Sequence, residues 1–347
     1  MGKKIVIKLC LLLLLLLGLN AVYNHTLLPH DLNVFAKEDL RIKQSADSCD
    51  VYYFGESSNV TYKPEDSVKT AISGLCQLFY PTLHLVNINK YATHAGIYKD
   101  WLQQIPLHKK KPKAIIVTMN LRSFGAAWIH SKLETSLQQS LVMGKPYPKI
   151  LNRFILALQA FDNKTDEQRE KEMLDEWKSV TLKFPVPFAY KTVREWDDAM
   201  ANGGYTMPDG SWDTKKIELA CHYIKAYAFN LNANNPRIHD FDVISEWCRS
   251  NGVNLYLNLM AENISYADSL VGKELVILMR QNKEFLKQRY QNNHCVFVDN
   301  LECVRGIDFI DQQWTTEHYN QRGRMRIAKN LAEALKEQFK EFYINAY

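Results

Sequence analysis

Cysteine is sparse in this sequence, with 7 in 347 residues, and the spacing of these cysteines resembles no zinc site. Cys10 lies in the N-terminal apolar segment, and most of the others stand in apolar stretches such as CHYIKAY and CVFVDN, where buried free thiols are expected. A chain of this length also does not need disulfides as a framework. We therefore expect no metal centre and no disulfide scaffold. No sequence motif indicates a cofactor, so none is expected.

Aromatic side chains are absent from the most basic stretch of the chain. Lys and Arg total 43 against 38 acidic residues, a net charge of +5, and the densest basic run is HKKKPK at 108–113. Without interleaved aromatics, such a run indicates a solvated loop rather than a nucleic-acid-binding surface. The apolar fraction of 46% is typical of a globular protein. We expect no nucleic-acid partner.

The N-terminus has the layout of an export signal. The basic stretch MGKKIVIK is followed by LCLLLLLLLGLNAVY, an apolar run of about 15 residues with no clean cleavage site after it. Residues 1–23 are therefore predicted to be either a signal peptide that is removed or a tilted signal-anchor that stays in the membrane. Positive residues before the apolar run place the bulk of the chain outside, which predicts a periplasmic, cell-surface or secreted location. Residues 24–47 are expected to be a linker.

From residue 48 onward, short apolar runs alternate with amphipathic stretches, the pattern of a parallel sheet with crossover helices. Strands are expected at 51–54, 83–87, 114–118, 253–259 and 295–299, and helices near 65–79, 95–104, 238–250, 268–290 and 322–343. Residues 126–237 break the alternation and are predicted to be a mainly helical insertion that caps a site. The predicted fold of 48–347 is a three-layer α/β/α domain, flavodoxin-like, with five parallel strands in the order 2-1-3-4-5.

This strand order predicts where a ligand binds. The switch point lies between the first and third strands, which end at GESSN and TMNLRSFG. Ser57 stands there as a candidate nucleophile, and a serine hydroxyl needs a base and donors for the oxyanion that it creates. The candidate base is His318, in DQQWTTEHYNQRGR after the fifth strand. Loops that leave the carboxyl ends of parallel strands share one rim of the sheet, so His318 is expected over Ser57.

The candidate oxyanion donors lie on the same rim. They are the backbone N–H of Ser57, the backbone of Gly96 in ATHAGIYKDWL and the side-chain amide of Asn120. Arg122 stands two residues after Asn120, and it either meets an anionic substrate or braces an acidic neighbour. Together these residues predict a site for acyl transfer.

The four segments resemble, in order and spacing, the four sequence blocks of the SGNH (GDSL-type) hydrolase superfamily. GESSN resembles the nucleophile block, with Glu56 where aspartate is usual, and HYNQRG at 318–323 resembles the histidine block. The other two blocks correspond to Ala95-Gly96 and to Asn120, and the match covers 48–125 and 238–343. The resemblance implies that Ser57 is the nucleophile, that His318 is the base, and that Ser57, Gly96 and Asn120 form the oxyanion hole.

One position departs from the family pattern. The family usually carries an aspartate three residues before the histidine, and here that residue is Thr315. Glu317 and Asp311 are the candidates to replace it, although the side chain of Glu317 would have to curl back to reach the adjacent ring. The remaining alternatives are a Ser-His dyad and an inactive site.

A serine nucleophile with an oxyanion hole transfers acyl groups, either to water or to another hydroxyl. With the exported N-terminus, this predicts an esterase or O-acyltransferase acting on envelope or extracellular O-acylated, especially O-acetylated, glycans. More loosely, the chain resembles membrane-anchored SGNH-like proteins that act beside a membrane-bound O-acyltransferase. Two alternatives stay open: an inactive glycan-binding or scaffold protein working with such a transferase, and a lipase or lysophospholipase with a long apolar acyl tunnel.

Overall fold

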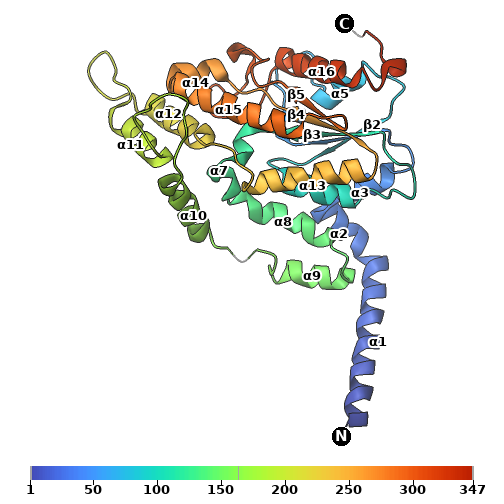
Figure 1. Cartoon of the computed structure of the whole chain (residues 1–347). Helices are drawn as coiled ribbons and strands as arrows, with labels where there is room; N and C mark the ends of the chain where they lie inside the picture. The colour runs from blue at the N-terminus through green and yellow to red at the C-terminus, as the bar shows by residue number, and fades with distance from the viewer. Residues whose placement is uncertain (1, 163, 346–347) are drawn as a thin grey trace.

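A five-stranded parallel sheet forms the centre of the computed structural model, which describes residues 2–162 and 164–345 (Figure 1). The strands are β1 (Val51–Gly55), β2 (Leu85–Asn89), β3 (Ala114–Met119), β4 (Asn254–Leu259) and β5 (Cys295–Asp299). They pair in the order β2-β1-β3-β4-β5, and every neighbouring pair is parallel. Every residue of β1 and β3 is buried, as continuous apolar runs in a parallel sheet require. The predicted α/β fold and strand order are confirmed.

Helices cover both faces of the sheet. One face is covered by α6 (Ala95–Gln103), α13 (Pro236–Ser250) and α15 (Lys273–Tyr290), and the other by α5 (Ile72–Gln77) and α16 (Gln321–Leu335). Because successive strand residues point to opposite faces, Tyr52 and Phe54 pack into the first layer, while Val51 and Tyr53 pack into the second. The seven cysteines, all within the described residues, are free thiols.

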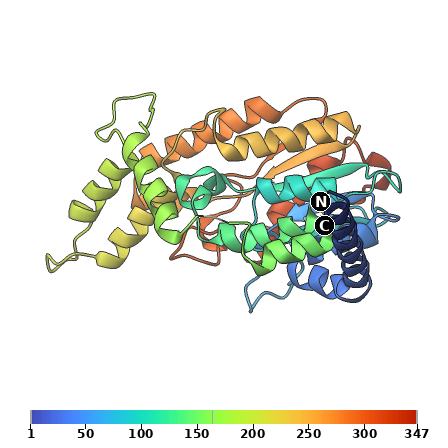
Figure 2. The same cartoon turned by 90° about the horizontal axis from the view of Figure 1, so that it is seen from below.

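The insertion at 126–237 is helical, as predicted. Its helices are α7 (Ala126–Ile129), α8 (Leu133–Gly144), α9 (Lys149–Ala157), α10 (Asp166–Ser179), α11 (Val193–Gly203) and α12 (Thr214–Tyr227). In its described residues the only β pairing is two isolated bridges. Helices α10 to α12 project beyond one end of the sheet in both views (Figures 1 and 2), whereas α8 runs back along the domain towards the N-terminal helices.

The N-terminal segment forms helix α1 (Gly2–Thr26), which extends away from the domain (Figure 1). By length and composition it could cross a membrane, and of residues 2–26 only Tyr23 is buried. The predicted linker at 24–47 is instead mostly helical, with α2 (Leu28–Phe35) and α3 (Lys37–Ser45). Ile42 of α3 is fully buried, and its carbonyl accepts a hydrogen bond of 3.1 Å from Tyr52 Oη. Because these short helices bury apolar side chains against the domain, the connection is packed.

Two other predicted helices differ from the observed ones. Of the predicted helix at 65–79, only residues 72–77 are helical. The segment before residue 72 is instead bound by Arg324 of α16, which is fully buried. Arg324 donates hydrogen bonds to the carbonyls of Val68 and Thr70 and to the Asp66 carboxylate. The predicted helix at 268–290 is interrupted at Gly272, where φ is 119°. It forms α14 (Ile264–Leu270) and α15. Neither cause can be read from hydrophobic periodicity.

Asp39 of α3 makes folding stability depend on pH. Burial raises the pKa of its carboxyl to about 7, Glu38 adds to the rise, and Lys43 opposes it. The folded chain therefore holds a proton that the unfolded chain releases near its ordinary pKa of 3.8, so stability falls as the pH rises from 3.8 to about 7 and levels off above that. We expect Asp39→Asn to raise the free energy of unfolding at pH 8 by up to about 4 kcal/mol, with no gain at pH 3.

Urea unfolding of the detergent-solubilised chain at the two pH values measures this difference. The control is Asp47→Asn, since the side chain of Asp47 is exposed and, within the part of the chain that the structure describes, is bonded only to exposed Lys109. The same increment for Asp39→Asn at both pH values would contradict the prediction.

Candidate active site

Strand β1 passes directly into a short helix that begins at Ser57. The helix is α4 (Ser57–Val60), and the carboxylate of Glu56 caps it by accepting a hydrogen bond of 2.8 Å from the Ser58 N–H. Gly55 is required at the end of β1, because a Cβ there would lie 2.9 Å from both Asn89 Oδ1 and the Tyr53 ring. This turn places Ser57 at the carboxyl end of β1, at the edge of the sheet predicted for the nucleophile.

The hydroxyl of Ser57 has two acceptors for its single proton. Its Oγ lies 2.7 Å from Glu56 Oε2 and 3.0 Å from His318 Nε2. The contact with His318 joins residues from β1 and from the loop after β5, as expected for loops on one rim of a parallel sheet. Glu56, which stands where the SGNH pattern usually has aspartate, competes with the imidazole for the same proton.

The opposite nitrogen of the imidazole contacts Asp311. His318 Nδ1 lies 2.7 Å from Asp311 Oδ2, which also accepts a hydrogen bond of 2.6 Å from Thr316 Oγ1. A looped-back backbone holds the two residues together: Phe309 and Tyr319 form an antiparallel bridge, and Ile310 N–H donates to the His318 carbonyl. Asp311, His318 and Ser57 therefore form one continuous hydrogen-bonded chain, the arrangement of a serine-histidine-aspartate triad.

Glu317 makes a different contact. Its carboxylate is almost completely buried and accepts a hydrogen bond of 2.6 Å from Arg122 Nε, so it is not the acid beside the His318 ring. The Arg122 guanidinium is also buried and lies 4.8 Å from the centre of the Trp128 ring. Of the two roles considered for Arg122, the structure shows the one in which it braces an acidic neighbour.

A second buried acid, Glu262, lies behind this ion pair and was not singled out from the sequence. It follows β4, and its Oε2 accepts a hydrogen bond of 2.6 Å from Tyr227 Oη of α12. Burial raises the pKa of Glu262 well above its usual range, and the charge of Glu317 raises it further. The uncharged form of Glu262 is therefore favoured in this buried position behind the Arg122–Glu317 contact.

The parallel pairing of β1 with β3 brings Ser57 and Asn120 to the same end of the sheet. Pairing runs from Val51 with Ala114 to Phe54 with Val117, and Ser57 and Asn120 each follow within a few residues of the last pair. Among the described residues, Asn120 Oδ1 is buried without a hydrogen-bond partner. The Ser57 N–H is the first of α4 and has no acceptor within that helix. Both groups are suitable donors to an oxyanion.

Gly96 lies in the first turn of α6, where its N–H already has an acceptor. It donates to His94 Nδ1 at 3.1 Å, and His94 Nε2 in turn lies 2.8 Å from Glu134 Oε1 of α8. A Cβ on Gly96 would lie 2.9 Å from the His94 ring and 3.0 Å from Asp240 Oδ2. Close packing of α6 against α13 explains this glycine, and in this conformation its N–H is not free for an oxyanion.

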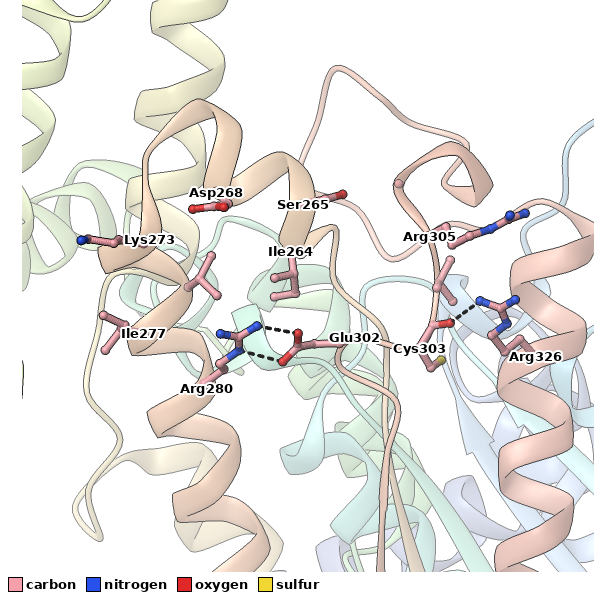
Figure 3. Close-up of a pocket in the computed structure, with 13 residues that line it drawn as sticks. Ile264, Ser265, Asp268, Lys273, Ile277, Arg280, Glu302, Cys303, Arg305 and Arg326 are labelled. Atoms are coloured by element: carbon pink, nitrogen blue, oxygen red, sulfur yellow. Dashed lines mark hydrogen bonds and ion pairs between the residues drawn. The ribbon is translucent and has the colours of Figure 1, made fainter.

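Two hollows lie among the loops at this end of the sheet. One, of about 540 Å³, is lined by residues 310–314, which include Asp311. Trp314 of this hollow is half-exposed, and its ring contacts the His222 ring of α12, with 3.7 Å between ring centres. The other, of about 490 Å³, lies between α14, α15 and α16, with Arg280 bonded to Glu302 and Arg326 to the Cys303 carbonyl (Figure 3). Its lining includes none of Ser57, His318 and Asp311.

No protein-family model matches the sequence, and no curated protein matches it. Among solved structures, the chain is similar to the crystal structure of the lipase/acylhydrolase from Enterococcus faecalis, with 8% sequence identity and a TM-score of 0.33. That match covers 83% of this chain and 95% of the other. A similarity at this score carries no functional argument, so any function must be argued from the geometry around Ser57.

Proposed function

We propose that this chain is an SGNH-type serine esterase or O-acyltransferase. The observation that carries the proposal is the hydrogen-bonded chain from Asp311 through His318 to the Ser57 hydroxyl. Each ring nitrogen faces the partner that acyl transfer needs, with a carboxylate at Nδ1 and a hydroxyl at Nε2. We assign Ser57 as nucleophile, His318 as general base and Asp311 as the acid that orients the imidazole.

The geometry supports a two-step mechanism. His318 Nε2 takes the Ser57 proton as Oγ attacks the acyl carbonyl, and Asp311 stabilises the imidazolium through Nδ1–H. The Ser57 N–H and the Asn120 amide stabilise the oxyanion. Return of the proton from His318 to the leaving alcohol gives an acyl-enzyme. Water or an acceptor hydroxyl, deprotonated by His318, then attacks the acyl group and restores the Ser57 hydroxyl.

O-acetylated glycans of the cell envelope or the exterior are the substrate class that we propose. The apolar helix α1 favours an extracytoplasmic location, where a membrane-bound O-acyltransferase would be a natural partner. Trp314, which was not singled out from the sequence, supports a sugar ligand, because its half-exposed ring lines the same hollow as Asp311 and aromatic faces stack on sugars.

Acetate release from an O-acetylated polysaccharide, compared with hydrolysis of p-nitrophenyl esters of increasing chain length, tests this function. We expect acetyl esters to be preferred and Ser57→Ala to release no acetate. A preference for long acyl chains would identify a lipase. Binding of the polysaccharide without turnover or acyl-enzyme formation would favour an inactive scaffold.

Trp314→Ala tests the sugar contact separately from the chemistry. We expect KM for the polysaccharide to rise by about 3- to 10-fold, because a stacked ring contributes about 0.5–1.5 kcal/mol. The KM for p-nitrophenyl acetate, which lacks a sugar, should not change. Steady-state kinetics on both substrates measure this, and an equal rise on both would show that Trp314 acts on the site as a whole.

A further inference from the structure

Helix α9 exposes an apolar stripe on its outer side. Leu151 and Phe154 of the helix and Leu158 at its C-cap follow one another at steps of three and four residues, so their side chains lie along one side, and Tyr147 stands just before the helix. All four are exposed, and Leu158 has 76% of its surface accessible. The other side of α9 is already packed, since Leu156 belongs to a buried cluster with Ala36, Val142 and Met143. The stripe is thus a second apolar face, which folding of the chain leaves uncovered.

The position of α9 relative to α1 is fixed by hydrogen bonds. Asn20, which follows the last leucine of the apolar run, accepts a bond of 3.1 Å from the Ile150 N–H through its Oδ1. The Asp31 carboxylate of α2 accepts a bond of 2.7 Å from Tyr23 Oη and lies 3.0 Å from Arg153 Nε. These contacts join α1, α2 and α9, and Figure 1 shows α9 lying across the direction of α1 at its domain end.

We propose that α9 lies flat on the bilayer that α1 crosses, with its exposed stripe in the boundary between headgroups and acyl chains. If α1 spans the membrane, its apolar part ends at Asn20, and this polar end belongs at the interface. Because α9 meets the Asn20 end of α1 at a steep angle, α9 would run along the membrane surface. An apolar helix face is buried in that position without the helix crossing the bilayer. Lys145, two residues before Tyr147, is exposed and is available to anionic headgroups.

The same contacts indicate that α1 is retained. Removal of residues 1–23 would take away the acceptor of the Ile150 N–H and the Tyr23 hydroxyl that donates to Asp31. It would also leave the α9 stripe without the span that brings it to the lipid. This inference does not depend on the chemistry at Ser57.

Quenching by brominated lipid tests the proposal on the full chain. In a Cys10→Ser background, which removes the exposed native thiol, Leu158→Cys carries an environment-sensitive nitrobenzoxadiazole label. The matched control is Ile307→Cys, in the 3₁₀ helix Gly306–Asp308, because Ile307 is 78% exposed. Each protein is reconstituted into phosphatidylcholine and phosphatidylglycerol vesicles, with or without bromine near the carbonyl end of the acyl chains. The Cys10→Ser protein without an introduced cysteine, treated with the same label, gives the background fluorescence to subtract.

We expect bromine to lower the fluorescence of the label at 158 by about half or more and to leave the label at 307 unchanged. A label at Phe154→Cys should repeat the result at 158, which guards against a local effect of one substitution. Equal quenching at 158 and 307, or none at 154 and 158, would overturn the proposal. A protein partner on the stripe would then be sought by crosslinking from the same cysteines.

Discussion

Ser57→Ala should abolish covalent labelling by a fluorophosphonate probe and lower ester turnover by about 10⁴-fold or more. The probe phosphonylates a serine only when a base activates the hydroxyl, and Ser57 Oγ lies 3.0 Å from His318 Nε2. His318→Ala should have an effect of the same size, because nucleophile and base act as one unit. Intact mass after incubation with the probe, and initial rates on p-nitrophenyl acetate, measure the two effects.

The neighbouring serine provides a matched control for this experiment. Ser58 is completely buried, and its Oγ has no hydrogen-bond partner among the described residues. Ser58→Ala should therefore keep one adduct per chain and most of the turnover. Labelling that survives Ser57→Ala would contradict the assignment, and a folded parent that forms no adduct would mean that the site is not active in the isolated chain.

Asp311→Asn should lower kcat by about 10³- to 10⁴-fold and leave the unfolding midpoint nearly unchanged. The Asp311 carboxylate accepts the proton of His318 Nδ1 at 2.7 Å, which leaves Nε2 free to take the Ser57 proton. An asparagine amide can donate to Nδ1 and so favour the tautomer with its proton on Nε2. The Asp311 side chain is 37% exposed, so its substitution removes little buried structure.

Glu317→Gln is the matched comparison and should have the opposite profile. Glu317 is buried against Arg122, so neutralising it leaves a buried guanidinium without its carboxylate and costs about 3 kcal/mol or more of folding free energy. Molecules that remain folded should keep the Asp311–His318 contact and most of their kcat. Urea unfolding and kinetics on both variants separate the two roles. Loss of kcat in Glu317→Gln, with full activity in Asp311→Asn, would identify Glu317 as the catalytic acid.

The strand order and the meeting of Ser57 with His318 could be predicted from the sequence. Buried parallel strands are continuous apolar runs, and the carboxyl ends of such strands share one rim, so the loops after β1 and β5 were expected to meet. The choice between Asp311 and Glu317 could not be predicted. It depends on the backbone looping back between Phe309 and Tyr319, which has no periodic signal. Similarly, the raised pKa of Glu262 depends on contacts between distant segments.

The expected linker illustrates a second limit of sequence reasoning. Residues 28–45 form two short helices whose apolar positions are too few to distinguish them from a polar connection, yet Ile42 is fully buried in the domain. Gly96 illustrates a third. A glycine that opens a helix matches the SGNH pattern, but its N–H is bonded to His94 Nδ1. The Ile42 contact joins two separate segments, whereas the Gly96 contact is a local side-chain cap that hydrophobic periodicity does not reveal.

The packed connection through α2 and α3 determines the reach of the enzyme that we propose. A flexible chain of about 24 residues would let the domain explore a radius of roughly 25 Å around its anchor. Because α2 and α3 pack on the domain, that freedom is lost. With α1 in the membrane, the active site therefore stays at one distance from the bilayer and at one tilt. Only acyl groups presented at that height can react, which favours a polymer that moves past the membrane surface over ester groups within the lipid layer.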